Sequence, residues 1–172
     1  MARYIVDSQI DNHEKYYFIR EQESQDIVLL PSKYLMHKKR SKLSPNTIRR
    51  SAGAISYYLN YIDETGIQLD DVWEMPYDKQ QEHFTDYLIW LQAGLHSGDS
   101  YKKKPYNETC NAYLKEVFRF YRFSGQQDES IKQLKVLSDM RIIVHNSVGV
   151  KRTLYRNCLL YTSPSPRDGA TS

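Results

Sequence analysis

The sequence predicts a mainly α-helical protein, a four-helix bundle preceded by a short β-hairpin. Apolar residues that recur every three or four positions predict the helices. Two β-prone runs near the N-terminus, joined by polar residues, predict the hairpin. The chain has 172 residues, of which 40% are hydrophobic and 26% charged, which suits one globular domain or a small domain with an appendage.

The hairpin is expected within residues 1–32. The runs "YYFIR" (16–20) and "DIVLL" (26–30) are the expected strands, and "EQESQ" is the five-residue connection between them. A two-stranded hairpin is marginally stable alone, so we expect it to pack on the bundle or on a ligand.

The clearest helix is expected in "LSPNTIRRSAGAISYYLNYIDETG". Ser44 is a good N-cap, Pro45 suits the first helical position, and Gly66 supplies the stop. One apolar stripe, expected to be core, consists of Ile48, Ala52, Ile55, Leu59 and Ile62.

Three further helices complete the predicted bundle, which is assigned to residues 33–140. "KQQEHFTDYLIWLQAGL" should bury Phe84, Leu88 and Leu91. The next helix is expected from Asn107, a possible cap, to Gly125. Its buried stripe is expected to be Cys110, Leu114, Val117 and Tyr121. A short fourth helix is expected over residues 128–140, with Ile131, Leu134 and Leu137 facing inward.

Charge is segregated along the chain, although the net charge is only +3. Residues 33–50 carry seven Lys/Arg and no acid, and residues 102–122 carry six bases against two acids. Residues 63–86 carry eight acids against one lysine. Such segregation creates local fields that suit an anionic partner, and it also suits a merely solvated surface.

The sequence predicts no catalytic residue, no metal and no cofactor. The five histidines never fall at i, i+4, and two cysteines exclude a disulfide framework or a four-cysteine zinc site. The sequence contains neither a glycine-rich loop of the kind that binds phosphate nor the serine motif of a nucleophile elbow. Without an apolar run of membrane-spanning length, the expected location is the cytoplasm, with no membrane attachment.

Two helix starts lie beside basic residues and could bind phosphates. A helix N-terminus presents free N–H groups and a partial positive charge. In the helix that begins at Asn107, spacing predicts that Lys115, Arg119 and Arg122 share a face away from the apolar stripe, and that Asn111 lies on this face too.

The first and third predicted helices resemble those of the core-binding, SAM-like domain of phage-type tyrosine recombinases (integrases). The first has the Ser/Thr-rich start, apolar helix and closing glycine, with Ser51 where that family has tyrosine. The later helix is similar at Thr109, Asn111, Leu114, Phe120, Tyr121 and Phe123. The resemblance covers about residues 16–156. It implies a helical clamp on duplex DNA, in a protein that integrates or excises a mobile element. The tyrosine nucleophile of the family belongs to a separate C-terminal domain, so no catalytic residue is carried over.

The basic clusters, the helix starts and the resemblance together predict a set of DNA contacts. The predicted phosphate contacts are Lys38, Lys39, Arg40, Lys42, Arg49, Arg50, Lys102, Lys103, Lys104, Lys115, Arg119 and Arg122. The predicted helix-start or base-edge contacts are Asn46, Thr47, Thr109 and Asn111. The expected partner is double-stranded DNA, with self-association on DNA in the parent protein. The alternative is a helical protein-interaction module whose basic faces have no DNA role.

The C-terminal part divides into two expected segments. Residues 141–157 are interpreted as a linker toward a missing catalytic domain. In residues 158–172, "CLLYTSPSPRD" can be encoded by a string that looks like a transposon-end sequencing adapter. We therefore expect a translated adapter there, and the alternative is a disordered Ser/Pro tail.

Overall fold

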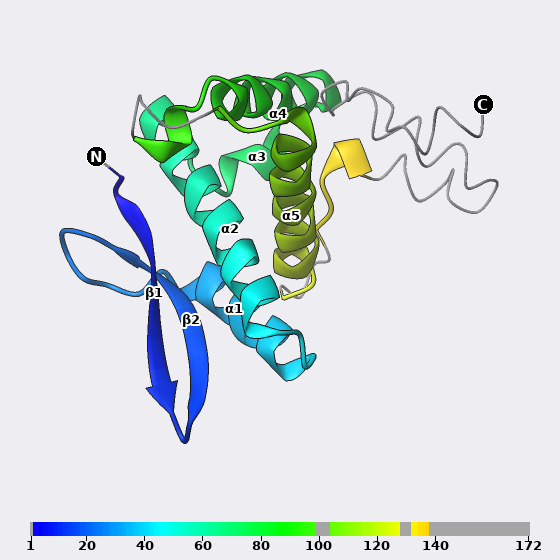
Figure 1. The fold of residues 1–172 in the computed structure, drawn as a ribbon. Coiled ribbons are helices and arrows are strands. Elements are labelled where there is room, and N and C mark those ends of the chain that lie inside the picture. The colour runs from blue at the N-terminus through cyan, green and yellow to red at the C-terminus, as the bar shows by residue number, and fades with distance from the viewer. Residues whose placement is uncertain (1, 99–103, 128–131, 138–172) are drawn as a thin grey trace, which may run out of the picture.

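The computed structural model describes residues 2–98, 104–127 and 132–137 (Figure 1). It confirms a mainly helical fold with an N-terminal antiparallel hairpin. The elements are β1 (Tyr4–Asp11), β2 (Glu14–Glu21), α1 (Leu29–Arg40), α2 (Pro45–Thr65), α3 (Asp71–Glu74), α4 (Tyr77–Gln92), the 3-10 helix η1 (Leu95–Ser97) and α5 (Asn107–Gly125).

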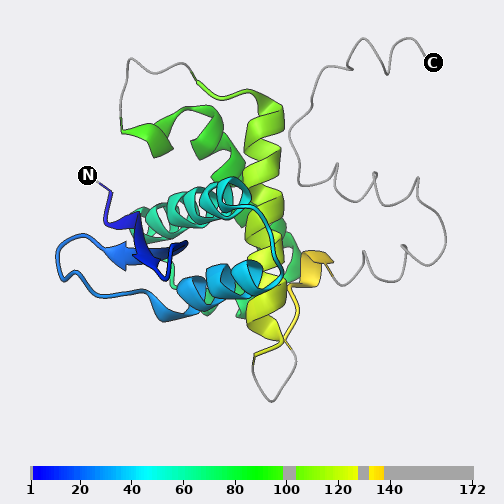
Figure 2. The same ribbon diagram turned by 60° about the horizontal axis from the view of Figure 1, so that its bottom comes forward.

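The two longest described helices, α2 and α5, pack against each other in opposite directions at the centre of the fold (Figure 1). Helix α4 lies across one end of this pair and contacts both helices. Helix α1 packs on α2 and α5 near the other end, and the hairpin lies against α1 and α2 (Figure 2). The hairpin is thus placed on one side of the bundle, beside α2.

The hairpin exists, but only one of its two predicted strands is a strand in the structure. The strands pair from Tyr4 with Glu21 to Asp11 with Glu14, so "YYFIR" belongs to the second strand and not to the first. A two-residue turn joins them, with positive φ at Asn12 and His13, as type I′ turns require. This turn was not predicted because His13 stands where such turns favour glycine. Residues 26–30 do not form a strand: Ile27 makes one isolated antiparallel bridge to Arg20, and Leu29 and Leu30 begin α1.

The hairpin is part of the hydrophobic core, as expected for so small a sheet. Ile19 of β2 is completely buried. Two polar side chains of α2 also hold the first strand. The Asn60 side-chain oxygen accepts a hydrogen bond from the Tyr4 N–H, and the Asn60 amide nitrogen and the Ser56 hydroxyl both donate to the Tyr4 carbonyl. The hairpin therefore presents a fixed surface beside α2.

Helix α2 is built as its sequence predicts. The Ser44 hydroxyl accepts a hydrogen bond from the Thr47 N–H at 3.2 Å, and Pro45 is the first helical residue. Gly66 ends the helix in the left-handed region, with φ of 72°. The whole predicted stripe of α2 is buried. Since this stripe faces inward, Arg49 and Arg50 are left exposed on the outer surface.

Helices α4 and α5 also bury their predicted stripes. Cys110 is a free, buried thiol, and burial raises its pKa to about 11. The predicted cap of α5 was wrong: the N-cap is Tyr106, and Asn107 is the first helical residue. The Asn107 side-chain oxygen accepts a hydrogen bond from Gln92 and so joins α5 to the end of α4.

The predicted fourth helix is described only in part. Leu134 and Leu137 are buried, as expected, whereas Ile131 lies outside the described residues. Helix α1, in turn, was not predicted. The linker assigned to residues 141–157 and the tail at 158–172 also lie outside the described residues.

Candidate nucleic-acid interface

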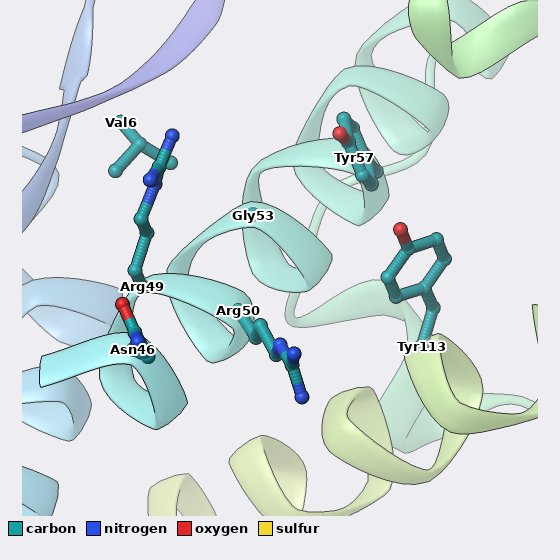
Figure 3. A pocket seen from close by; sticks show the side chains of 7 residues that line it. All are labelled: Val6, Asn46, Arg49, Arg50, Gly53, Tyr57 and Tyr113. Carbon is teal, nitrogen blue, oxygen red and sulfur yellow. The ribbon is translucent and has the colours of Figure 1, made fainter. Parts of the chain in front are cut away.

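A groove with a volume of about 550 Å³ lies along the outer face of α2 (Figure 3). Strand β1 forms one wall and helix α5 the other. The lining residues are Val6, Asn46, Arg49, Arg50, Gly53, Tyr57 and Tyr113. Three of the predicted DNA contacts, Asn46 and the two arginines, therefore meet in one concave surface.

Arg49 and Arg50 extend from α2 to different sides of the groove. Arg49 points toward Val6 of β1, and Arg50 points toward α5 (Figure 3). Both side chains are exposed. Within the described ranges neither forms an ion pair, so both guanidinium groups keep their hydrogen-bond donors for an external anion.

Two tyrosines form the aromatic end of the groove. The rings of Tyr57 and Tyr113 meet edge to face, with centroids 5.4 Å apart, and His96 of η1 packs 4.8 Å from Tyr57. Burial raises the pKa of Tyr113, although nearby Arg50 acts in the opposite direction. The Tyr113 hydroxyl therefore stays protonated at neutral pH and can donate a hydrogen bond.

Lys38 and Lys39 do not lie on an open basic surface, contrary to expectation. The Lys38 ammonium lies 2.8 Å from the Glu116 carboxylate, and its side chain is only 11% exposed. Lys39 contacts the hairpin, with its ammonium 3.7 Å from Glu14 and over the Tyr16 ring. These lysines join α1 to α5 and to β2, because their carboxylate partners come from elements that pack against α1.

Glu116 is the centre of a buried polar network. Besides Lys38, its carboxylate accepts a hydrogen bond from the Tyr34 hydroxyl at 2.5 Å and one from Arg119 at 3.1 Å. Burial alone would raise the pKa of Glu116, but the hydrogen bonds from Lys38 and Tyr34 outweigh it and hold the pKa below its ordinary value. Glu116 is thus ionised and neutralises Lys38 and Arg119.

The predicted basic face of α5 is only partly present. Arg122 is exposed, and Arg119 is 58% exposed while bonded to Glu116. Lys115 is half-buried. The expectation for Asn111 was wrong: this residue is 7% exposed and lies on the buried side of α5. Asn111 follows Cys110 of the buried stripe and is buried beside it.

The remaining predicted contacts do not line the groove: some are exposed or half-buried, and two lie outside the described residues. The exposed ones are Arg40, Lys42, Thr47 and Lys104. The Thr47 hydroxyl lies 2.8 Å from that of Ser44 and so takes part in the helix cap. Thr109 is half-buried in the first turn of α5. Lys102 and Lys103 are outside the described residues.

Four residues of the groove were not predicted: Val6, Gly53, Tyr57 and Tyr113. Both tyrosines were interpreted as packing residues because they adjoin the apolar stripes. Helical spacing could have identified Gly53 and Tyr57 as residues of this surface. They follow Arg50 at three and seven positions, so they lie on the same side of α2. Nothing in the local sequence could have placed Val6 or Tyr113 there, since both reach the groove through tertiary packing.

Comparison with models of protein families, with curated proteins and with solved structures finds no match to this chain. Of the helices that the structure describes, none is both long and apolar enough to traverse a lipid bilayer. In the described ranges, no three His, Cys, Asp or Glu side chains are grouped so that they could hold a metal ion.

Proposed function

We propose that this chain binds double-stranded DNA through the groove on α2, as the N-terminal, core-binding part of a tyrosine recombinase. The observation that carries the proposal is that Asn46, Arg49 and Arg50 all line one concave surface. Arginine supplies several fixed donors that match phosphate oxygens, and the asparagine amide can bond either a phosphate or a base edge.

The distribution of charge along α2 supports an anionic ligand at its N-terminal half. The first turns carry exposed arginines and follow exposed Lys42, whereas the last turn carries Asp63 and Glu64. The N-terminal end of a helix also has a partial positive charge. A polyanion is therefore attracted more to the groove than to the other end of α2, where Asp63 already pairs with Arg3.

The resemblance to core-binding domains adds the wider role. In such a protein the helical domain holds one face of the duplex, and a separate domain cuts and rejoins the strands through a phosphotyrosyl intermediate. The parent protein would associate with itself on DNA and integrate or excise a mobile element. No residue of the present chain is assigned to that chemistry.

A DNA titration tests the proposal. A fluorescent duplex of mixed sequence, followed by anisotropy, should bind with a dissociation constant on the order of 10⁻⁵ M at physiological salt, because half of a clamp has near non-specific affinity. If about six cations meet phosphates, log K should fall against log salt with a slope of about −5. A slope near zero would overturn the proposal, and tight binding to an acidic protein would then favour the interaction module.

A further inference from the structure

Gly53 occupies the middle of α2, where glycine is unfavourable. Glycine in a helix interior is less stable than alanine by about 1 kcal/mol, because its backbone loses more freedom on folding. Internal packing does not require it: a Cβ atom built at Gly53 has nothing within 4 Å. This differs from Gly125, where a Cβ would lie 2.0 Å from the Lys132 carbonyl oxygen. The space beside Gly53 is therefore left open to the outside.

That open space belongs to the groove. Gly53 lines it between Arg50 and Tyr57, so a strip of bare helix backbone separates the guanidinium groups from the tyrosine pair (Figure 3). The Tyr57 and Tyr113 hydroxyls have no hydrogen-bond partner among the described residues. The two tyrosine hydroxyls and the Arg50 guanidinium thus lie on either side of Gly53, where a ligand can contact the backbone of α2.

We infer that Gly53 admits the DNA sugar–phosphate backbone against α2, and that Tyr57 and Tyr113 donate hydrogen bonds to the phosphate that Arg50 binds. The inference rests on the proposed function and adds three binding residues to it. A phosphodiester fits because it accepts hydrogen bonds and carries a negative charge, while the tyrosine rings can pack on the deoxyribose. A glycine at a close contact between backbone and ligand is a general use of this residue.

Substitution at Gly53 separates binding from stability. Gly53→Ala should raise the urea midpoint of unfolding, because alanine favours the helix, and should nevertheless weaken duplex binding. Gly53→Leu should weaken binding more strongly, by about tenfold or more, because the side chain fills the contact position. Ala93→Leu, which adds similar bulk at the exposed C-terminal end of α4, should bind like the wild type.

Removal of each hydroxyl tests the other half of the inference. Tyr57→Phe and Tyr113→Phe keep the rings and should each weaken duplex binding by about tenfold, as expected for a hydrogen bond to a charged group. These variants, together with Gly53→Ala, decide the question even if Gly53→Leu does not fold.

The outcomes distinguish the two proposals. If the wild type does not bind the duplex, both fail. If the wild type binds and Arg50→Gln weakens binding, but the Gly53 and tyrosine variants bind like the wild type, the inference is overturned and the proposed function stands.

Discussion

Glu116 neutralises two of the cations that the sequence predicts as DNA contacts. Its carboxylate binds Lys38 from α1 and Arg119 from its own helix. The sequence places Lys38 in a basic run, but it does not show that the buried Glu116 carboxylate of α5 lies next to the Lys38 ammonium. The sequence therefore shows where the cations are concentrated, but it could not predict which of them are neutralised inside the fold.

We expect Glu116→Gln to lower the free energy of unfolding by about 3 kcal/mol, because the buried Lys38 loses its counter-charge. Urea unfolding measures the change. Glu82→Gln is the matched control: Glu82 pairs with Lys79 on the surface of α4, and loss of such a pair costs less than about 1 kcal/mol. Equal effects of the two variants would contradict the structural role of Glu116.

His83 gives the fold a pH-dependent stability. Its ring is buried, its Nε2 lies 2.8 Å from the Tyr58 hydroxyl, and burial lowers its pKa from 6.5 to about 4. Between these values the unfolded chain binds a proton that the native ring excludes. The free energy of unfolding should therefore fall as pH drops from about 6.5 to about 4, by up to about 3 kcal/mol.

Urea unfolding at several pH values measures this dependence. His83→Phe should flatten the decline between about pH 6.5 and 4, because the titrating group is gone. The contribution of Glu116, whose pKa is lowered, is present above the ordinary pKa of 4.5 and is lost only as pH falls below it. An unchanged slope in the His83 variant would show that another group is responsible.

At the scale of elements, the sequence predicted the helices with a clear apolar stripe. It did not predict the element whose position depends on tertiary contacts. Helices α2 and α5 have continuous apolar stripes, and both were predicted to within about two residues. Helix α1 buries only Pro31, Tyr34 and Leu35, while Leu29 is exposed. Its sequence therefore shows little periodicity, and its position depends on contacts with β2, α2 and α5.

The hairpin should behave as part of the bundle and not as an appendage. We expect Ile19→Ala to lower the free energy of unfolding by about 2–5 kcal/mol, because it leaves a cavity in the core. Ile10→Ala, near the hairpin turn, is the control, since Ile10 is 70% exposed and should have little effect. A separate unfolding transition for the hairpin, followed by circular dichroism, would contradict this account.

At the scale of the whole molecule, the fold brings distant residues into one cationic groove. Asn46, Arg49 and Arg50 were predictable because helical spacing places them off the buried stripe. The wall from β1 and the tyrosine of α5 were not predictable, because the packing of the hairpin and of two antiparallel helices creates them. The sequence thus indicated the charged floor of the site, and the tertiary structure supplies its shape.

The most direct test of the DNA-binding groove is the salt dependence of duplex binding by Arg49→Gln/Arg50→Gln. Each lost phosphate contact should reduce the slope of log K against log salt by about 1, so the double variant should have a slope less negative by about 2 than the wild type. Lys79→Gln, which removes a cation from α4 outside the groove, should keep the wild-type slope. A double variant that retains the wild-type slope and affinity would contradict the account.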